Sequence, residues 1–233
     1  MRTDVGIREF ESPSALDDQL VARVSNLLSA AIAQTGSASL VVSGGRTPKG
    51  FFHLLSQEDI LWPDILVTLA DERWVDASHA DSNEKLVREN LLINLASKAK
   101  FMSLKNSSPT AAQGVERLEY DLASAGSFTV VILGMGDDGH TASLFPGSNS
   151  ISAGLDMNSG SQCVAVMPLD APHERMSMTL PRLLNTQEII IHLCGEDKRN
   201  VLSDAFSGKD PYKLPIRAIL QQEKTPVAVY WSK

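Results

Sequence analysis

Residues 130–147 read VVILGMGDDGHTASLFPG, and this stretch decides how the chain is interpreted. The apolar run VVIL predicts a buried strand, and the glycines after it predict a tight turn at the carboxyl end of that strand. Gly134, Gly136 and Gly139 have the G-x-G-x-x-G spacing of a dinucleotide-binding loop. However, two acidic residues lie inside the turn and a histidine follows it at once. The turn therefore either holds a pyrophosphate or presents a catalytic side chain.

The residues around the turn argue against a nucleotide. A dinucleotide loop leads into a full helix whose first N–H groups face the pyrophosphate, but Pro146 would end such a helix within about two turns of Gly139. The carboxylates of Asp137 and Asp138 would also face the phosphates. We therefore favour a turn that projects Asp138 and His140 into a cleft, where a neutral imidazole can act as a general base on water. A helix-capping histidine is the structural alternative.

Apolar strands alternate with helical patterns along the rest of the chain. We expect strands at 39–43, 64–72, 127–134, 163–168, 188–195 and 225–231, and helices at 14–34, 48–55, 83–95, 110–124 and 196–206. This alternation predicts an α/β fold with a mostly parallel sheet covered on both faces. No linker or repeat interrupts it, so we expect one domain over residues 1–233.

Composition limits the classes of partner. The 233-residue chain is 43% apolar and carries a net charge of −7, which argues against a nucleic acid held by phosphate neutralisation but not against a small anion. Cys163 and Cys194 lie in apolar runs, so we expect buried thiols in a reducing, cytoplasmic compartment and no metal site. No apolar stretch approaches the roughly 20 residues of a membrane span. We expect a monomer or a homodimer.

Four polar loops follow predicted strands, at 43–50, 70–83, 134–143 and 194–200. Ligands of parallel sheets bind beyond the carboxyl ends of the strands. We therefore expect these four loops to form one site.

The motifs in these loops have a familiar pattern. GMGDDGHTASLFPG, together with SGGRTP, LADERWV followed by DSN, and RMSMTLPRLLN, resembles the 6-phosphogluconolactonase family, within the wider glucosamine-6-phosphate isomerase/deaminase superfamily. The resemblance extends from about residue 5 to 231. It implies a Rossmann-like three-layer α/β/α sandwich with no bound nucleotide and no cofactor. It also implies hydrolysis of 6-phospho-D-glucono-1,5-lactone to 6-phospho-D-gluconate in the oxidative pentose phosphate pathway.

The resemblance implies a role for each motif residue. His140 would activate water, Arg73 would stabilise the oxyanion, and Asp71 would hold the water or a sugar hydroxyl. The substrate phosphate would bind the following residues: Ser43, Gly44, Gly45, Arg46, Thr47, Arg175 and Lys198. Asp138, Gly139 and Asn83 would support the loops, and Glu72 would bond to the backbone. Two assignments have alternatives: Arg46, where the superfamily often has serine, can point to solvent, and Lys198 can be a surface charge.

The sequence leaves two alternatives to lactone hydrolysis, a deaminase/isomerase and a non-catalytic sugar-phosphate sensor. In the deaminase/isomerase branch a glutamate partners the histidine, and Phe145 occupies that position here. A sugar-phosphate sensor would keep the SGGRTP loop but would not need Asp71 and His140 together. The remaining histidines are interpreted as structural, with His79 the one nearest a site loop: His53, His79, His173 and His192.

Overall fold

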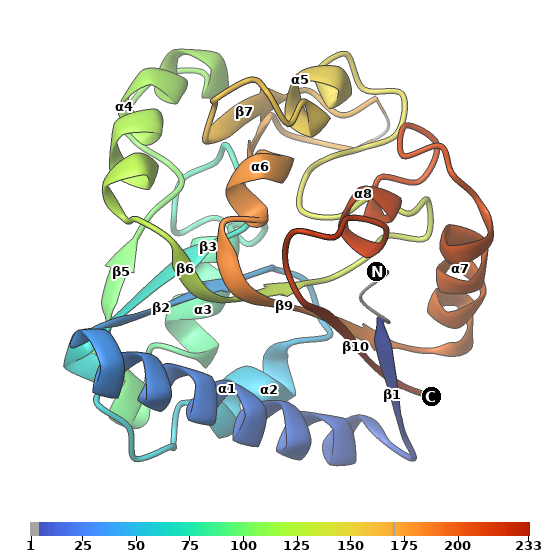
Figure 1. Ribbon diagram of the computed structural model, residues 1–233. Helices are drawn as coiled ribbons and strands as arrows, with labels where there is room; N and C mark the ends of the chain where they lie inside the picture. Colours follow the sequence, from blue (N-terminus) through green and yellow to red (C-terminus); the bar gives the residue numbers. More distant parts are fainter. Residues whose placement is uncertain (1–4, 170) are drawn as a thin grey trace.

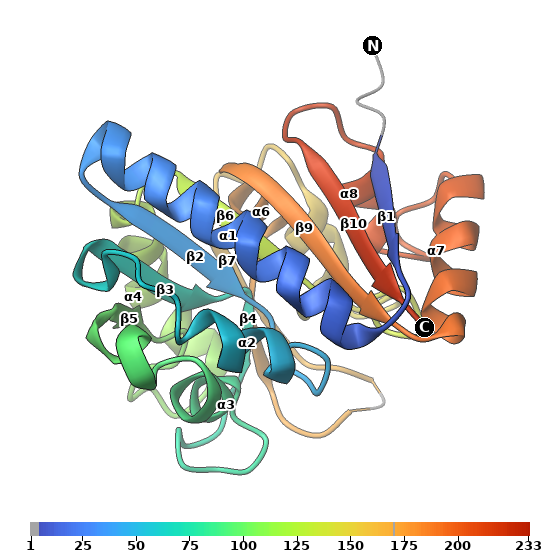
Figure 2. The same ribbon diagram turned by 90° about the horizontal axis from the view of Figure 1, so that it is seen from below.

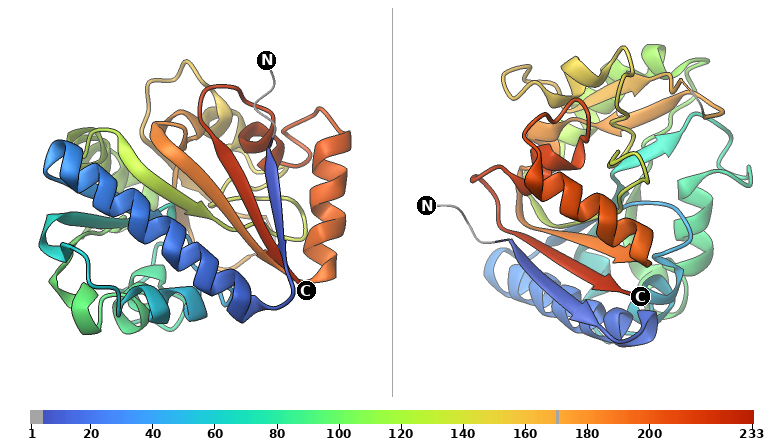
Figure 3. Two further views of the ribbon diagram at one scale, coloured as in Figure 1. Left: turned by 60° about the horizontal axis from the view of Figure 1, so that its bottom comes forward. Right: turned by 90° about the vertical axis from the view of Figure 1, so that its right-hand side faces the viewer.

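The main sheet has seven parallel strands in the order β1-β10-β9-β6-β2-β3-β5. The structure is a computed structural model that describes residues 5–169 and 171–233 (Figure 1). The strands are β1 (Gly6–Phe10), β2 (Ala38–Val42), β3 (Ile65–Leu69), β5 (Lys100–Met102), β6 (Phe128–Leu133), β9 (Thr186–Cys194) and β10 (Val227–Ser232). Figure 3 shows β1 and β10, from opposite ends of the chain, side by side at one edge of the twisted sheet.

Helices cover both faces of this sheet, so the predicted α/β fold is confirmed. The α-helices are α1 (Pro13–Thr35), α2 (Lys49–Leu55), α3 (Asn83–Asn90), α4 (Ala111–Ser124), α5 (Ile151–Leu155), α6 (Leu180–Leu183), α7 (Glu196–Ser207) and α8 (Ile216–Leu220). Short 3₁₀ helices, η1 (Trp62–Asp64) and η2 (Asn94–Lys98), flank β3 and β5. Helices α1 and α2 lie on one face, and α6, α8 and a second, smaller sheet lie on the other (Figures 1 and 2). Among the described residues, no helix is long and apolar enough to cross a membrane.

Apolar sequence explains the central strands. Every residue of β2 (ASLVV) and β6 (FTVVIL) is buried, as expected for parallel strands packed on both faces. Helix α1 begins where the sequence predicts a start: the Ser12 hydroxyl accepts a hydrogen bond from the Ala15 N–H, with Pro13 at the first turn. It ends at Gly36, whose φ of 79° is accessible to glycine at little cost.

Two predicted strands of the parallel sheet are wrong in part. The run 64–72 divides at Ala70, and Asp71–Arg73 form a separate strand, β4, in a three-stranded sheet ordered β4-β8-β7. The run 163–168 contributes β7 (Cys163–Val166) to the same sheet, antiparallel to β8 (Arg175–Met178). The charged triplet of β4 cannot continue a buried parallel strand, and the half-buried pattern of β7 fits a sheet with one covered face.

The predicted helix at 83–95 also ends early. Helix α3 stops at Asn90, whose side-chain amide bonds to the Leu86 carbonyl, and the chain then turns through Asn94 with φ of 48°. The predictions omitted β1, β5, β8, α5, α6 and α8. These elements are short, and β1 is largely exposed, with two charged residues among its five.

The topology brings polar loops together at the carboxyl edge of the main sheet, where its parallel strands end. Strands β2, β3, β6 and β9 run parallel, so the loops that follow them leave the sheet at the same edge. This edge is where the sequence places the predicted site.

Candidate active site

A cavity of about 290 Å³ opens at this edge, and the four predicted loops line it. The lining includes ten of the predicted site residues: Ser43, Gly44, Gly45, Arg46, Thr47, Asp71, Arg73, Asn83, His140 and Lys198. Three predicted residues, Asp138, Gly139 and Arg175, are not in the lining. The walls also contain residues that the sequence did not single out, notably Met135, His192 and Cys194.

The glycine turn places His140 against the cavity. Gly139 has φ of 73°, and the Gly136 N–H donates a hydrogen bond to the His140 carbonyl at 2.8 Å, which closes the turn. A Cβ atom at Gly136 would lie 2.1 Å from His140 Nδ1. Glycine is therefore needed at Gly136 for the imidazole to fold back over the turn.

Asp138 determines which ring nitrogen of His140 carries the proton. Its Oδ1 lies 2.6 Å from His140 Nδ1 and also accepts the His140 backbone N–H at 3.1 Å. Burial acts to raise the pKa of Asp138, but these hydrogen bonds outweigh it and keep that pKa below its ordinary value. An ionised carboxylate can only accept, so Nδ1 carries the ring proton and Nε2 keeps its lone pair. Asp138 and His140 are only two residues apart, and their side chains meet because the glycines bend the backbone sharply.

Phe145 packs on the other side of His140. The two ring centroids are 4.4 Å apart, and the rings are tilted by 41°. An apolar ring cannot exchange a proton with the imidazole. Asp138 is therefore the carboxylate that contacts His140.

Asp71 is held at the base of the cavity. Its Oδ2 accepts a hydrogen bond from the Ser143 hydroxyl at 2.5 Å, and its backbone carbonyl accepts one from the Asn83 amide at 2.9 Å. Asn83 in turn packs against Gly44, where a Cβ atom would lie 1.9 Å from the Asn83 side-chain oxygen. The SGGRTP loop and β4 are thereby joined through Asn83. Ser143 belongs to the stretch 130–147, but a serine at this position does not by itself predict a hydrogen bond to Asp71.

Glu72 has a structural position, as its sequence context predicted. Its carboxylate accepts the backbone N–H groups of Arg73, Asn83 and Glu84 at 2.6–2.7 Å. Two of these donors are the first residues of α3, where carboxylates are favoured. Burial raises the pKa of Glu72, while the three backbone bonds oppose that shift.

Two arginines lie together beside the cavity. Arg73 on β4 is opposite Arg175 on β8, and Arg73 donates to the Asp81 carbonyl at 2.5 Å. Arg175 is buried and donates to the Pro172 carbonyl at 3.2 Å. Burial and the neighbouring Arg73 lower the pKa of Arg175. Two adjacent guanidinium groups favour an anion at this side of the cavity.

Lys198 extends toward the cavity from the first turn of α7. Its ammonium group lies 2.5 Å from Asp137 of the glycine turn. The adjacent Arg199 points elsewhere: it contacts Glu9 and lies 4.5 Å from the Trp231 ring centre. Lys198 therefore lies at the cavity and Arg199 at the surface. The sequence alone does not decide whether Lys198 is a surface charge.

A buried pair of ionisable side chains, His192 and Asp17, lies at the cavity wall, which His192 helps to line. His192 on β9 is 4% exposed, and its Nε2 lies 3.6 Å from Asp17 Oδ1 on α1. Burial lowers the pKa of His192 to about 4, and burial together with Asp18 raises the pKa of Asp17 to about 6. At neutral pH this geometry therefore holds a neutral imidazole beside a destabilised carboxylate.

Known proteins share both the sequence pattern and the fold. Residues 11–231 match the family described as glucosamine-6-phosphate isomerases/6-phosphogluconolactonase. The chain is 39% identical to a 6-phosphogluconolactonase of Rhizobium meliloti, over 96% of this chain and 97% of that protein. The crystal structure of a 6-phosphogluconolactonase from Shewanella baltica superposes with a TM-score of 0.96, at 46% identity and full coverage of both chains. A monomeric glucosamine-6-phosphate deaminase, 15% identical, covers 98% of each chain with a TM-score of 0.83 and so shares the fold.

Proposed function

Because the chain belongs to the glucosamine-6-phosphate isomerase/6-phosphogluconolactonase family, we propose that it hydrolyses 6-phospho-D-glucono-1,5-lactone to 6-phospho-D-gluconate. This is the second step of the oxidative pentose phosphate pathway. The observation that carries the proposal is the Asp138–His140 pair, whose imidazole lines a cavity that also holds Asp71, Arg73 and Lys198. The two cysteines are free thiols within the described chain, and this supports a reducing cytoplasmic location.

The phosphate of the substrate binds at the cationic side of the cavity. The backbone N–H groups of the SGGRTP loop and the ammonium group of Lys198 contact its oxygens, since charge-assisted bonds to such donors are strong. Arg46 also lines the cavity and adds a cation at the loop. Arg175, which is buried and paired with Arg73 across β4 and β8, is the second side-chain cation for the phosphate, together with Lys198.

His140 is the base. Its Nε2 takes a proton from water as the water oxygen attacks C1 of the lactone. Asp138 stabilises the imidazolium that forms, as a carboxylate does when it holds the second ring nitrogen. The tetrahedral intermediate then breaks its bond from C1 to the ring oxygen, which becomes the 5-hydroxyl by taking the proton from His140.

Arg73 and Asp71 serve the same step from β4. Arg73 donates to the oxygen on C1 as negative charge develops there. Asp71 accepts a hydrogen bond from the attacking water or a sugar hydroxyl, and Ser143 fixes the carboxylate for this purpose. Both side chains line the cavity with His140.

The deaminase branch is the second candidate, and the contacts of His140 argue against it. The resemblance places a glutamate that partners the histidine at the position of Phe145 in the deaminase branch. Here that position carries an aromatic ring 4.4 Å from the imidazole. Ester hydrolysis needs only a base, a water molecule and support for the oxyanion.

A two-substrate assay tests the proposal. Freshly prepared lactone, coupled to oxidation of the 6-phosphogluconate formed, should be consumed well above its spontaneous rate. Unphosphorylated gluconolactone should be a poor substrate, and glucosamine 6-phosphate should release no ammonia. A lactone rate equal to the background, or ammonia release, would contradict the proposed activity.

A further inference from the structure

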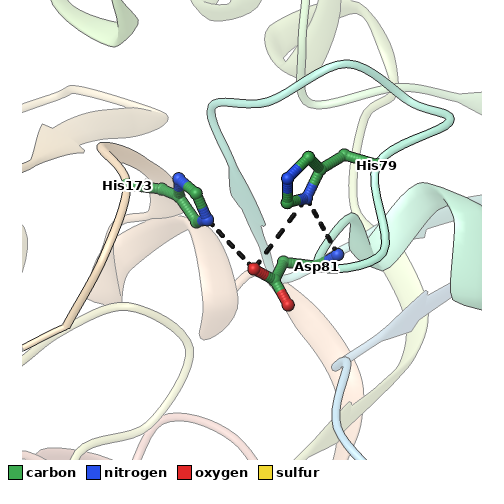
Figure 4. A group of neighbouring side chains, drawn as sticks. All are labelled: His79, Asp81 and His173. Carbon is green, nitrogen blue, oxygen red and sulfur yellow. Dashed lines mark hydrogen bonds and ion pairs between the residues drawn. The ribbon is translucent and has the colours of Figure 1, made fainter.

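A second group of ionisable side chains lies outside the cavity. His79 and Asp81 belong to the loop between β4 and α3, and His173 belongs to the loop between β7 and β8 (Figure 4). One nitrogen or oxygen from each of the three lies within 4.8 Å of the others. Each side chain is partly exposed, by 45%, 50% and 27% respectively, so an ion can reach the group from solvent.

The three side chains converge on one carboxylate oxygen. Asp81 Oδ2 is 3.0 Å from His173 Nε2 and 3.9 Å from His79 Nδ1. Two ligands of a tetrahedral zinc ion lie about 3.3 Å apart, given bond lengths near 2.0 Å. The Asp81–His173 separation is within about 0.3 Å of that value, and the Asp81–His79 separation exceeds it by about 0.6 Å. The His79 and His173 nitrogens, which lie within 4.8 Å of each other, must approach by up to about 1.5 Å, which exposed side chains can do.

Hydrogen bonds of Asp81 to His79 and His173 already hold the three candidate ligand atoms close to one another. His79 Nδ1 accepts the backbone N–H of Asp81 at 3.1 Å, so this nitrogen is unprotonated, and its one lone pair would turn from that N–H to a bound ion. His173 Nε2 and Asp81 Oδ2 are hydrogen-bonded at 3.0 Å, so two of the three ligand atoms already face each other. His173 has φ of 69°, a backbone conformation that histidine adopts more readily than most residues, and its ring faces Asp81.

We propose that His79, Asp81 and His173 bind a divalent transition-metal ion, for which zinc is the best match. Two imidazoles and a carboxylate form a common zinc ligand set, with water completing the tetrahedron. To bind the ion, His173 carries its ring proton on Nδ1 and gives up its hydrogen bond to Asp81, and His79 Nδ1 gives up its bond from the Asp81 N–H. Any proton released from His173 passes to the buffer. Arg73 opposes the cation, whereas the nearby carboxylate of Asp76 favours it.

Bound metal would join two loops that lie far apart in the sequence. It would also fix Asp81, whose backbone carbonyl accepts the hydrogen bond from Arg73 of the cavity. The site is thus a clamp beside the cavity, and the metal takes no part in the chemistry proposed above. The inference goes beyond the proposed function and does not depend on it.

Calorimetric titration of chelator-treated protein with zinc, without substrate, tests this site. We expect one equivalent to bind, and His173→Gln, Asp81→Asn or His79→Gln to weaken binding by at least about tenfold, since each removes one ligand. Zinc at about 100 times its Kd should raise Tm of the parent protein by roughly 5–10 °C. The three variants should show little of this increase.

His53→Gln is the matched control, because His53 is an exposed histidine on α2. It should bind zinc as the parent protein does. The proposal is overturned if the parent shows no one-to-one binding, or if the three ligand variants bind as tightly as the parent. Binding lost in a His140→Asn variant but kept in His173→Gln would place the ion in the cavity and would also overturn it.

Discussion

At the scale of single residues, the proposed mechanism depends on one hydrogen bond. The 2.6 Å contact between Asp138 Oδ1 and His140 Nδ1 assigns the proton to one ring nitrogen and leaves the other free. The sequence predicted the histidine as base but gave Asp138 only a loop-supporting role. Residue spacing does not show that the glycine turn brings the Asp138 carboxylate to Nδ1 of the His140 ring.

Replacing Asp138 by asparagine tests this contact. The amide can donate to Nδ1, so the ring would carry its proton on Nε2 and lose its basic lone pair. We expect kcat to fall by about 10²–10⁴-fold with little change in KM, as for other bases with the wrong tautomer. Steady-state kinetics with correction for spontaneous hydrolysis measures this. A variant with parental kcat would show that the tautomer is irrelevant.

Lys198 and Arg199 form a natural pair for testing the phosphate site. Lys198→Ala should raise KM by about 10- to 150-fold, because a charge-assisted bond contributes roughly 1.5–3 kcal/mol. Arg199→Ala should change KM by less than about twofold, since Arg199 contacts Glu9 and Trp231 at the surface. Equal effects of the two changes would remove Lys198 from the phosphate site.

The buried Asp17 makes a prediction about stability and pH. Its pKa is raised to about 6 in the folded protein. The free energy of unfolding therefore falls as pH rises from about 4 to 6, and above pH 6 the whole destabilisation is present. The pKa of His192, lowered to about 4, acts in the opposite direction, because its stabilising contribution is lost as pH falls below about 6.5.

We therefore expect Asp17→Asn to be more stable than the parent by about 2–3 kcal/mol at pH 7 and to lose that advantage near pH 4. Denaturant unfolding at several pH values measures the difference. Asp59→Asn, at an exposed position, should show a small difference at every pH. A constant advantage for Asp17→Asn would disprove the assigned shift.

At the scale of elements, the sequence predicts the long apolar segments well and the short polar ones poorly. The strand at 128–133 and the helix at 13–35 were predicted to within a few residues, because apolar periodicity and capping residues mark them. Strands β4 and β8 are short and contain arginine, so no local pattern indicates them. They form because β8 pairs with β4 on one side and β7 on the other, and pairing partners are not visible in a single sequence.

Glu72 shows how an element depends on one such residue. We expect Glu72→Gln to lower the free energy of unfolding by about 1–3 kcal/mol, because the amide cannot accept all three backbone N–H groups and leaves buried donors unpaired. Urea denaturation measures this. Glu89→Gln is the control, since Glu89 is exposed and lies 4.0 Å from Lys85, and its change should stay within about 0.5 kcal/mol. Similar effects of both changes would show that Glu72 is not a cap.

At the scale of the whole molecule, the parallel sheet gathers the site. Residues separated by more than 100 positions, such as Arg46 and Lys198, line one cavity because their strands end at one edge. The sequence predicted this edge, since the rule depends only on strand direction. It did not predict the cluster of His79, Asp81 and His173, because that cluster depends on how two loops outside the main sheet meet.

The central claim is that His140 is the base of lactone hydrolysis, and the turnover of a His140→Ala variant tests it most directly. General-base catalysis contributes typically 10²–10⁴-fold, so kcat should fall by about that factor while KM changes little, because the phosphate end supplies most of the binding. A folded His140→Ala protein that keeps kcat within about threefold of the parent would contradict the account and leave Asp71 as the candidate base.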